Sequence, residues 1–184
     1  HTLGNGLTAL VYHLPGQYAV AARLGVPLRL SAEPREVEGV GTIMARTLTE
    51  GTERYSAQEF AVLLEREGVA IGAGVGDTSL EVDLDVAVNH LGAALELMRQ
   101  VVAEPAFPES EVKREVRTRL ADIEQERANP GSRAAQTMLG LLFAEGERAS
   151  RPTRGSAATV AAITRDSVVE FYTQHVGPRG AVLA

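Results

Sequence analysis

The sequence predicts an α+β fold, in which an antiparallel sheet carries helices on one face in a two-layer arrangement. Candidate strands come in neighbouring pairs along the chain and candidate helices come in runs, which is typical of this class. The segment from Ser79 to Val86 also alternates strictly between apolar and polar side chains. Such alternation indicates a strand with one buried and one solvated face, as in an antiparallel sheet. At 184 residues the chain is expected to form one domain, residues 1–184.

The first elements are expected to be two strands, a loop and a helix. Leu7 to Tyr12 follows an Asn-Gly turn, and Tyr18 to Leu30 follows a Pro-Gly turn and has alternating apolar residues. Ser31 to Glu38 is rich in charged residues and is expected to be a loop. Val40 to Leu48 is expected to be the first helix.

Capping signals define the next helix. Ser56 and Glu59 form a capping box, in which the serine oxygen accepts a hydrogen bond from the Glu59 amide and Glu59 reaches back to the serine amide. This helix is expected to end at Gly68, and Val69 to Val75 can pair with the alternating strand as a hairpin. The remaining elements are three helices, an Arg- and Gly-rich loop, a helix with a threonine cap and a final strand: Asn89–Ala103, Pro108–Arg127, Ser132–Phe143, Gly146–Ser156, the helix after Thr164, and Pro178–Ala184.

Composition excludes several kinds of partner and chemistry. The net charge of -6 argues against a nucleic acid or an anionic membrane as partner, since both require a basic surface. No apolar run is long enough to cross a bilayer and no signal peptide is recognisable, so a cytoplasmic location is expected. The lack of cysteine excludes thiol catalysis and cysteine-based zinc sites. Because the chain begins at His1 rather than at Met, we expect a fragment of a longer chain, and the Ala-, Gly- and Arg-rich usage favours a bacterial source.

The most informative segment runs from Gly39 to Thr52 and leads into the capped helix. Its frame resembles the one that carries the zinc site in the insulinase/pitrilysin-like (M16) metallopeptidases, where a helix bears H-x-x-E-H and a Gly-Thr pair follows. Counting back from Gly51-Thr52, the three family positions fall on Thr42, Ala45 and Arg46. Zinc needs imidazoles or anionic ligands, and hydrolysis needs a carboxylate that takes a proton from the metal-bound water. The resemblance therefore implies a member without metal and without catalytic residues at these positions.

Further matches follow the order of the family and cover nearly the whole chain. They are Asn5-Gly6-Leu7, Leu64–Thr78, Leu95–Met98, Glu104–Pro108, Gly155–Thr164, and Phe171-Tyr172 with Pro178. In active members a downstream glutamate completes the zinc site, and the resemblance places that position at Asp122, with a second family carboxylate at Glu115. Residues seven apart share a helix face. Two carboxylates without imidazoles make a weak oxygen site, so we expect no metal here and an ordinary pair between Glu115 and Arg119.

Three other patterns each have a functional and a simpler interpretation. Glycines alternate in Gly72-Ala73-Gly74-Val75, but no helix begins after them, as a phosphate cradle requires. A bulge or a close backbone approach is expected instead, and the resemblance implies that this strand lies along the peptide chamber. The acidic side chains of the alternating strand are expected on its solvated face: Glu81, Asp83 and Asp85. The loop from Gly146 to Ser156 contains three basic side chains: Arg148, Arg151 and Arg154. They are expected to be solvated, and the alternative is that they contact an acidic surface of a partner protein.

The resemblance also carries an expectation of function. M16 peptidases consist of four similar α+β lobes that close around a peptide chamber, and usually only the first lobe carries zinc. By resemblance, this chain would be a zinc-free, inactive lobe or subunit with no cofactor of its own. It would work on a peptide substrate with a zinc-bearing homologous half, in the same chain or in a second subunit, and a hetero- or homo-dimer is expected. The alternative is a scaffold or binding protein of the same fold with no proteolytic role. A new active site is disfavoured, because no nucleophile and base stand at a workable spacing.

Overall fold

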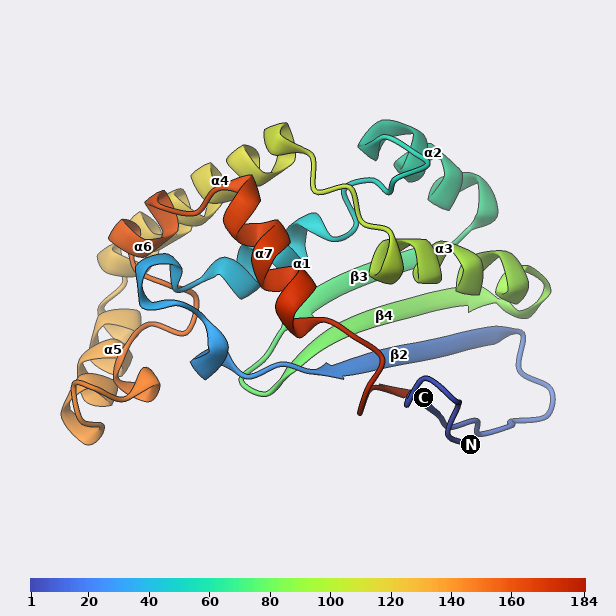
Figure 1. The fold of residues 1–184 in the computed structure, drawn as a ribbon, viewed down its shortest axis with the longest axis horizontal. Coiled ribbons are helices and arrows are strands. Elements are labelled where there is room, and N and C mark those ends of the chain that lie inside the picture. Colours follow the sequence, from blue (N-terminus) through green and yellow to red (C-terminus); the bar gives the residue numbers. More distant parts are fainter.

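The computed structural model describes residues 1–184 and has two layers, a five-stranded sheet and helices packed on one of its faces (Figure 1). The strand order is β1-β5-β2-β4-β3. The strands are Thr8–Ala9 (β1), Ala19–Pro27 (β2), Ala70–Val75 (β3), Ser79–Ala87 (β4) and Val182–Leu183 (β5). Only β1 and β5 run parallel, and every other neighbouring pair is antiparallel. The predicted fold class is confirmed, with one parallel pair added where the two ends of the chain meet (Figure 1).

The helical layer contains one helix more than the sequence predicts. The helices are Val40–Thr47 (α1), Ala57–Glu67 (α2), Leu91–Ala103 (α3), Glu109–Ala128 (α4), Pro130–Leu142 (α5), Ala157–Ala161 (α6) and Arg165–His175 (α7). The short α6 was missed, although Ser156 and Thr159 form a capping box at its start. The first strand is shorter than predicted, since its pairing stops at Ala9 rather than at Tyr12. None of the helices has both the length and the apolar character needed to span a bilayer.

The core lies between the inner face of the sheet and the helices. A single cluster of 26 buried apolar residues fills it. The alternation predicted for β4 is confirmed, because Leu80, Val82, Leu84 and Val86 are all buried. At the centre of the helical layer, α1 packs against α4, α7 and β3. This central position bears on the candidate site, since α1 is the helix to which the resemblance assigns the family's metal positions.

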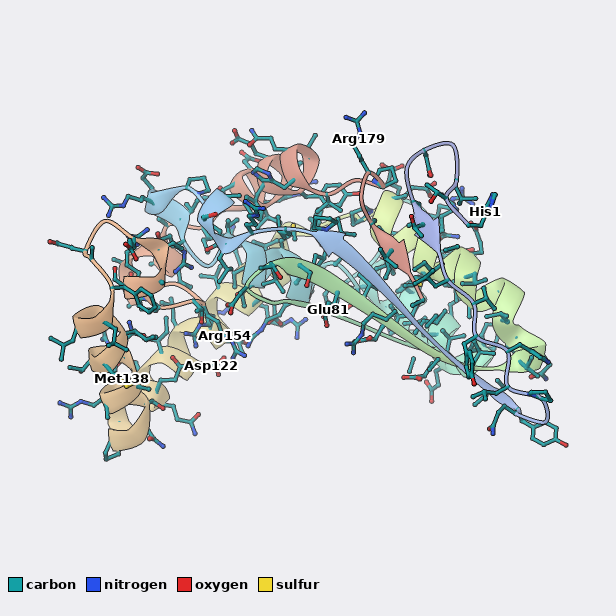
Figure 2. The ribbon with its side chains drawn as sticks, turned by 90° about the horizontal axis from the view of Figure 1, so that it is seen from below. His1, Glu81, Asp122, Met138, Arg154 and Arg179 are labelled. Carbon is teal, nitrogen blue, oxygen red and sulfur yellow. The ribbon has the colours of Figure 1, made fainter.

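The outer face of the sheet is left uncovered by helices, and the acidic side chains of β4 lie on it as expected. Figure 2 shows Glu81 on this face. Arg23 of β2 lies between two of the carboxylates, with its Nη1 3.3 Å from Glu81 and its Nε 2.6 Å from Asp83. The third acidic residue, Asp85, is exposed and has no ion pair.

The capping box of α2 forms as predicted and gives a direct stability test. The Ser56 hydroxyl accepts from the Glu59 amide, and the Glu59 carboxylate accepts from the Ser56 amide at 2.9 Å. These bonds from Ser56 lower the pKa of Glu59. Replacing Ser56→Ala should destabilise the fold by about 1 kcal/mol, measured by urea denaturation at neutral pH.

The same variant has a predictable pH dependence. A carboxyl group whose pKa is lowered in the folded state stabilises the fold above its unfolded pKa and loses that contribution as the pH falls through the folded value. The difference between wild type and Ser56→Ala should therefore shrink below the usual pKa range of glutamate. A difference that stays constant down to acid unfolding would contradict a role for the Glu59 carboxylate.

Candidate functional site

The three positions that the resemblance assigns to the zinc motif all lie on α1. Thr42 and Ala45 are buried, and the Arg46 side chain is about 30% exposed in the last turn of the helix. Thr42 and Arg46 are one helical turn apart and therefore share a face. None of the three side chains offers an imidazole or a carboxylate.

Arg46 lies between the two carboxylates that the sequence singled out. Its Nη1 atom is 3.7 Å from Oε2 of Glu115 and 3.4 Å from Oδ2 of Asp122. Both carboxylates project from α4, seven residues apart on one helix face as predicted, and α4 packs directly on α1. The guanidinium thus places a fixed positive charge where the two acidic side chains converge.

A divalent metal does not fit this arrangement. Nowhere in the chain do three or more His, Asp or Glu side chains gather in a way that could hold a metal ion. At the α1–α4 contact, two carboxylates are present, but the Arg46 cation neutralises them and repels a second cation. The donor set offers oxygen ligands alone, without the imidazoles that zinc sites of this type use.

The predicted pair between Glu115 and Arg119 is wrong. Glu115 contacts Arg46 and, at 3.5 Å, Arg114. Arg119 points away into the protein and is almost fully buried, where its two terminal nitrogens bind the Glu126 carboxylate at 2.7 and 3.0 Å. Its Nε also donates to the carbonyl of Arg154 at 3.2 Å, so Arg119 ties α4 to the loop before α6.

The prediction that the loop arginines are solvated is also wrong for two of the three. The Arg148 side chain is 11% exposed and donates to Oε2 of Glu33 at 2.8 Å, and that carboxylate is completely buried. Arg151 donates to Glu38 at 2.8 Å. Only the Arg154 side chain is exposed. Two loops more than 100 residues apart are therefore joined by buried ion pairs, and the expected charged loop from Ser31 to Glu38 turns its carboxylates inward.

Glu33 has a second role that sequence reasoning missed. Its Oε1 atom accepts from the backbone amide of Gly41 at 3.0 Å, in the first turn of α1. A carboxylate at a helix N-terminus satisfies a free amide and interacts favourably with the helix dipole. The ion-pair network therefore fixes the start of the same helix whose end carries Arg46. No local sequence signal identifies Glu33 as a cap, because it lies outside the helix.

The glycine-rich strand β3 is the edge of the sheet next to α1. Its register with β4 is unbroken over all six residues, so the expected bulge is absent. A Cβ atom placed on Gly72 or Gly74 would meet nothing within 4 Å, so the expected close approach is absent as well. The glycines instead leave the outer face of the edge strand bare. Val75 packs near the start of α1. Its Cγ1 atom lies 3.8 Å from the place where a Cβ atom would stand on Gly41.

The free side of β3 presents unpaired backbone groups. In an antiparallel ladder, successive residues point their N–H and C=O groups alternately toward the two neighbouring strands. Gly76 donates to the carbonyl of Ser79, which fixes the even-numbered residues of β3 toward β4. The groups of Ile71, Ala73 and Val75 must therefore point to the free edge. An extended peptide could pair with them beside α1.

The comparison with known families places this two-layer architecture in a peptidase family. The family model for Insulinase (Peptidase family M16) matches residues 10–156. The chain belongs to the M16 peptidase family.

Individual relatives are distant in sequence and close in fold. Uncharacterized zinc proteases from Rickettsia bellii and Mycobacterium tuberculosis are each 24% identical, over 94% and 100% of this chain and 42% of their own length. A solved structure described as a peptidase M16 inactive domain from Pseudomonas fluorescens aligns with a TM-score of 0.91 at 22% identity, over 100% of this chain and 45% of that one. The chain therefore spans less than half the length of these relatives.

Proposed function

We propose that this chain is a zinc-free, catalytically inactive lobe of an M16 peptidase. The observation that carries the proposal is the guanidinium of Arg46 between Glu115 and Asp122, because it puts a permanent side-chain cation where the family resemblance expects a metal. Thr42 and Ala45 supply neither a ligand nor a general base at the other two positions. The M16 inactive domain from Pseudomonas fluorescens, with the same fold, is consistent with this role.

In this proposal the lobe contributes a wall of the peptide chamber. Residues 1–184 form one lobe of a longer assembly, and zinc resides in a homologous half that binds this one, in the same chain or in a second subunit. The peptide substrate lies along β3, where it adds a strand through the free-edge groups of Ile71, Ala73 and Val75. The small residues Gly72 and Gly74 keep the outer face of that strand clear.

The absence of activity in isolation is tested with the chain alone. With zinc and an unstructured peptide, we expect no hydrolysis above the buffer background, because the proton-accepting carboxylate and the zinc ligands are missing. Turnover that a chelator abolishes would contradict the proposal. Adding a zinc-bearing homologous half should restore hydrolysis if the two bodies work together.

The peptide-binding role is tested at the free edge of β3. Replacing Ala73→Pro removes an amide that points to the free edge and leaves the ladder with β4 intact, because proline is tolerated on the open side of an edge strand. Binding of a fluorescent unstructured peptide, followed by polarisation, should weaken about tenfold, which is about 1.4 kcal/mol. Ala70→Ser is the matched control, since it leaves the free-edge amides in place, and it should bind as wild type does. Equal binding by wild type and Ala73→Pro would remove β3 from the proposal.

A second candidate function is a scaffold of the same fold with no proteolytic role. It is favoured by one relative, a protein described as non-peptidase homolog YmxG of Helicobacter pylori, which is 24% identical over 106 residues. This candidate predicts no peptide binding at β3 and no effect on the activity of a zinc-bearing homologue. The Ala73→Pro experiment therefore separates the two.

A further inference from the structure

Helix α5 lies at one end of the molecule, beyond the end of the sheet (Figure 1). Its main contacts are with α4 and with the turn Arg148–Ser150. None of its 13 residues is buried, whereas every other helix buries at least one residue. The helix therefore contributes little to the core of the lobe, and much of its surface is open to solvent.

The amphipathic pattern of α5 is inverted. The residues that line a groove toward α4 and α6 are polar: Ser132, Arg133, Gln136 and Thr137. Gly140 lies on the same inner side, where a Cβ atom would come 4.0 Å from the carbonyl oxygen of Ser150. Met138, Leu141 and Leu142 are three and four residues apart and share the opposite side, which we call the outer face of α5. A surface helix normally turns its apolar side chains to the core.

The outer face of α5 is large enough to form an interface. Met138 is 54% exposed, Leu141 83% and Leu142 66%, and Phe143, directly after the helix, is 38% exposed. At roughly 200 Å² for a fully exposed side chain of this size, these fractions leave roughly 500 Å² of mostly apolar surface. Apolar patches of this size often mark an interaction site. Two such faces in contact bury up to about 1,000 Å², the lower limit for a specific interface.

The charges at the two ends of α5 select the partner. Arg133 lies in the first turn, Glu145 and Glu147 follow the last turn, and all three are exposed. The ion pairs of this region join other residues and leave these three without a partner. Each charge has the same sign as the helix dipole at its own end, so both ends are electrostatically unfavourable in a single copy. An antiparallel second copy brings the basic end of one helix to the acidic end of the other.

We propose that two copies of this chain associate through the outer face of α5, with the two helices antiparallel. The arrangement is two-fold symmetric, and its axis passes near Met138, at the middle of the apolar face. A second copy supplies both features that this face requires, an uncharged apolar surface of equal size and end charges in the reverse order. The inference goes beyond the proposed function and is independent of it, because neither Arg46 nor β3 belongs to this surface.

The first test is the dependence of the molecular mass on concentration, measured by sedimentation equilibrium. An interface of this size predicts weak association, with a dissociation constant on the order of 100 µM. The chain should be mainly monomeric about tenfold below this value and mainly dimeric about tenfold above it. Leu141→Lys should weaken the dimer at least about tenfold, because it places an unpaired charge in the interface. Val62→Lys is the matched control, since Val62 is also an exposed apolar residue on a helix, and it should dimerise as wild type does.

The result of this measurement decides between a second copy and another occupant. A chain that stays monomeric at the higher concentration, or a dimer that Leu141→Lys leaves intact, would overturn the proposal. The inference is also wrong if the chain stays monomeric and a zinc-bearing homologous half slows amide hydrogen exchange in α5, because the face would then belong to that half.

Exchanging the end charges tests the antiparallel orientation. Arg133→Glu makes both ends of α5 acidic, and Glu145→Arg with Glu147→Arg makes both ends basic. Each variant alone should dimerise less than wild type, because like charges then meet. An equimolar mixture of the two should form a mixed dimer, since opposite charges meet again at both ends. A mixture that associates no better than the separate variants would rule out the antiparallel pairing.

A single introduced thiol locates the two-fold axis. The chain has no cysteine, so a disulfide from one new cysteine can form only between two copies. Under mild oxidation, Met138→Cys should give a covalent dimer on a non-reducing gel, because a residue near the axis lies close to its own counterpart. Val62→Cys should remain monomeric under the same conditions. Equal cross-linking of the two variants would show that the contact is random and that the inference is wrong.

Discussion

The double replacement Thr42→His with Arg46→His should create a zinc site on α1. It removes the guanidinium from between Glu115 and Asp122 and supplies two imidazoles one helical turn apart on the same face of α1. Two histidines and a carboxylate are a common ligand set of catalytic zinc sites. We expect zinc affinity, measured by isothermal titration, to rise at least about 100-fold over the native chain.

Two controls assign the effect to these residues. Arg46→Met alone removes the cation without adding ligands, and it should leave zinc affinity close to that of the native chain. Adding Asp122→Ala to the double replacement should remove most of the gain, because α4 then no longer supplies the third ligand. If the double replacement binds zinc no better than Arg46→Met, the α1 positions are not those of a lost metal site.

Much of the fold is predictable because its signals are local. The strict alternation of β4 follows from one buried face, and the capping box at Ser56 and the Gly68 end of α2 are encoded within a few residues. The short β1 was overestimated because Leu10 to Tyr12 has the apolar pattern of a strand. Strand pairing needs a partner, and β5 pairs with only two residues of β1.

The errors at the candidate site have a common physical origin. Glu33 and Arg148 are 115 residues apart, so no local sequence pattern predicts that they form an ion pair. The same holds for Arg46, whose partners lie on α4, although the resemblance did place Glu115 and Asp122 on one helix face. Charged residues in a loop are usually solvated. Arg148 is not, because folding brings the buried Glu33 carboxylate to it.

Removal of the Arg148 side chain should produce the largest loss of stability among single substitutions in the charged network. Arg148→Met leaves the Glu33 carboxylate, which is completely buried, without its cation. It also removes the donors that reach the carbonyls of Pro152 and Thr153 at 3.0 Å each. Breaking a buried ion pair by removing one partner costs about 3–5 kcal/mol. We expect a loss of that size in urea denaturation.

An exposed pair provides the matched control. Arg23 lies 2.6 Å from Asp83, but its side chain is 59% exposed. Arg23→Met should therefore cost far less than Arg148→Met, because exposed pairs are screened by water and salt. The contrast between the two arginine-to-methionine changes isolates burial as the cause, since the substitution is the same.

A double replacement distinguishes the loss of the Glu33–Arg148 ion pair from the cost of leaving the Glu33 carboxylate buried without a cation. Glu33→Gln keeps the shape of the side chain and an oxygen that can still accept from the Gly41 amide, and it removes the negative charge. Glu33→Gln combined with Arg148→Met should be less destabilising than the sum of the two single changes, because no unpaired charge remains buried. Simple additivity would mean that Glu33 is neutralised in the folded state by some group other than Arg148. In that case the α1 cap would not depend on the loop before α6, and Arg148→Met would leave the end of α1 and its Arg46 contact undisturbed.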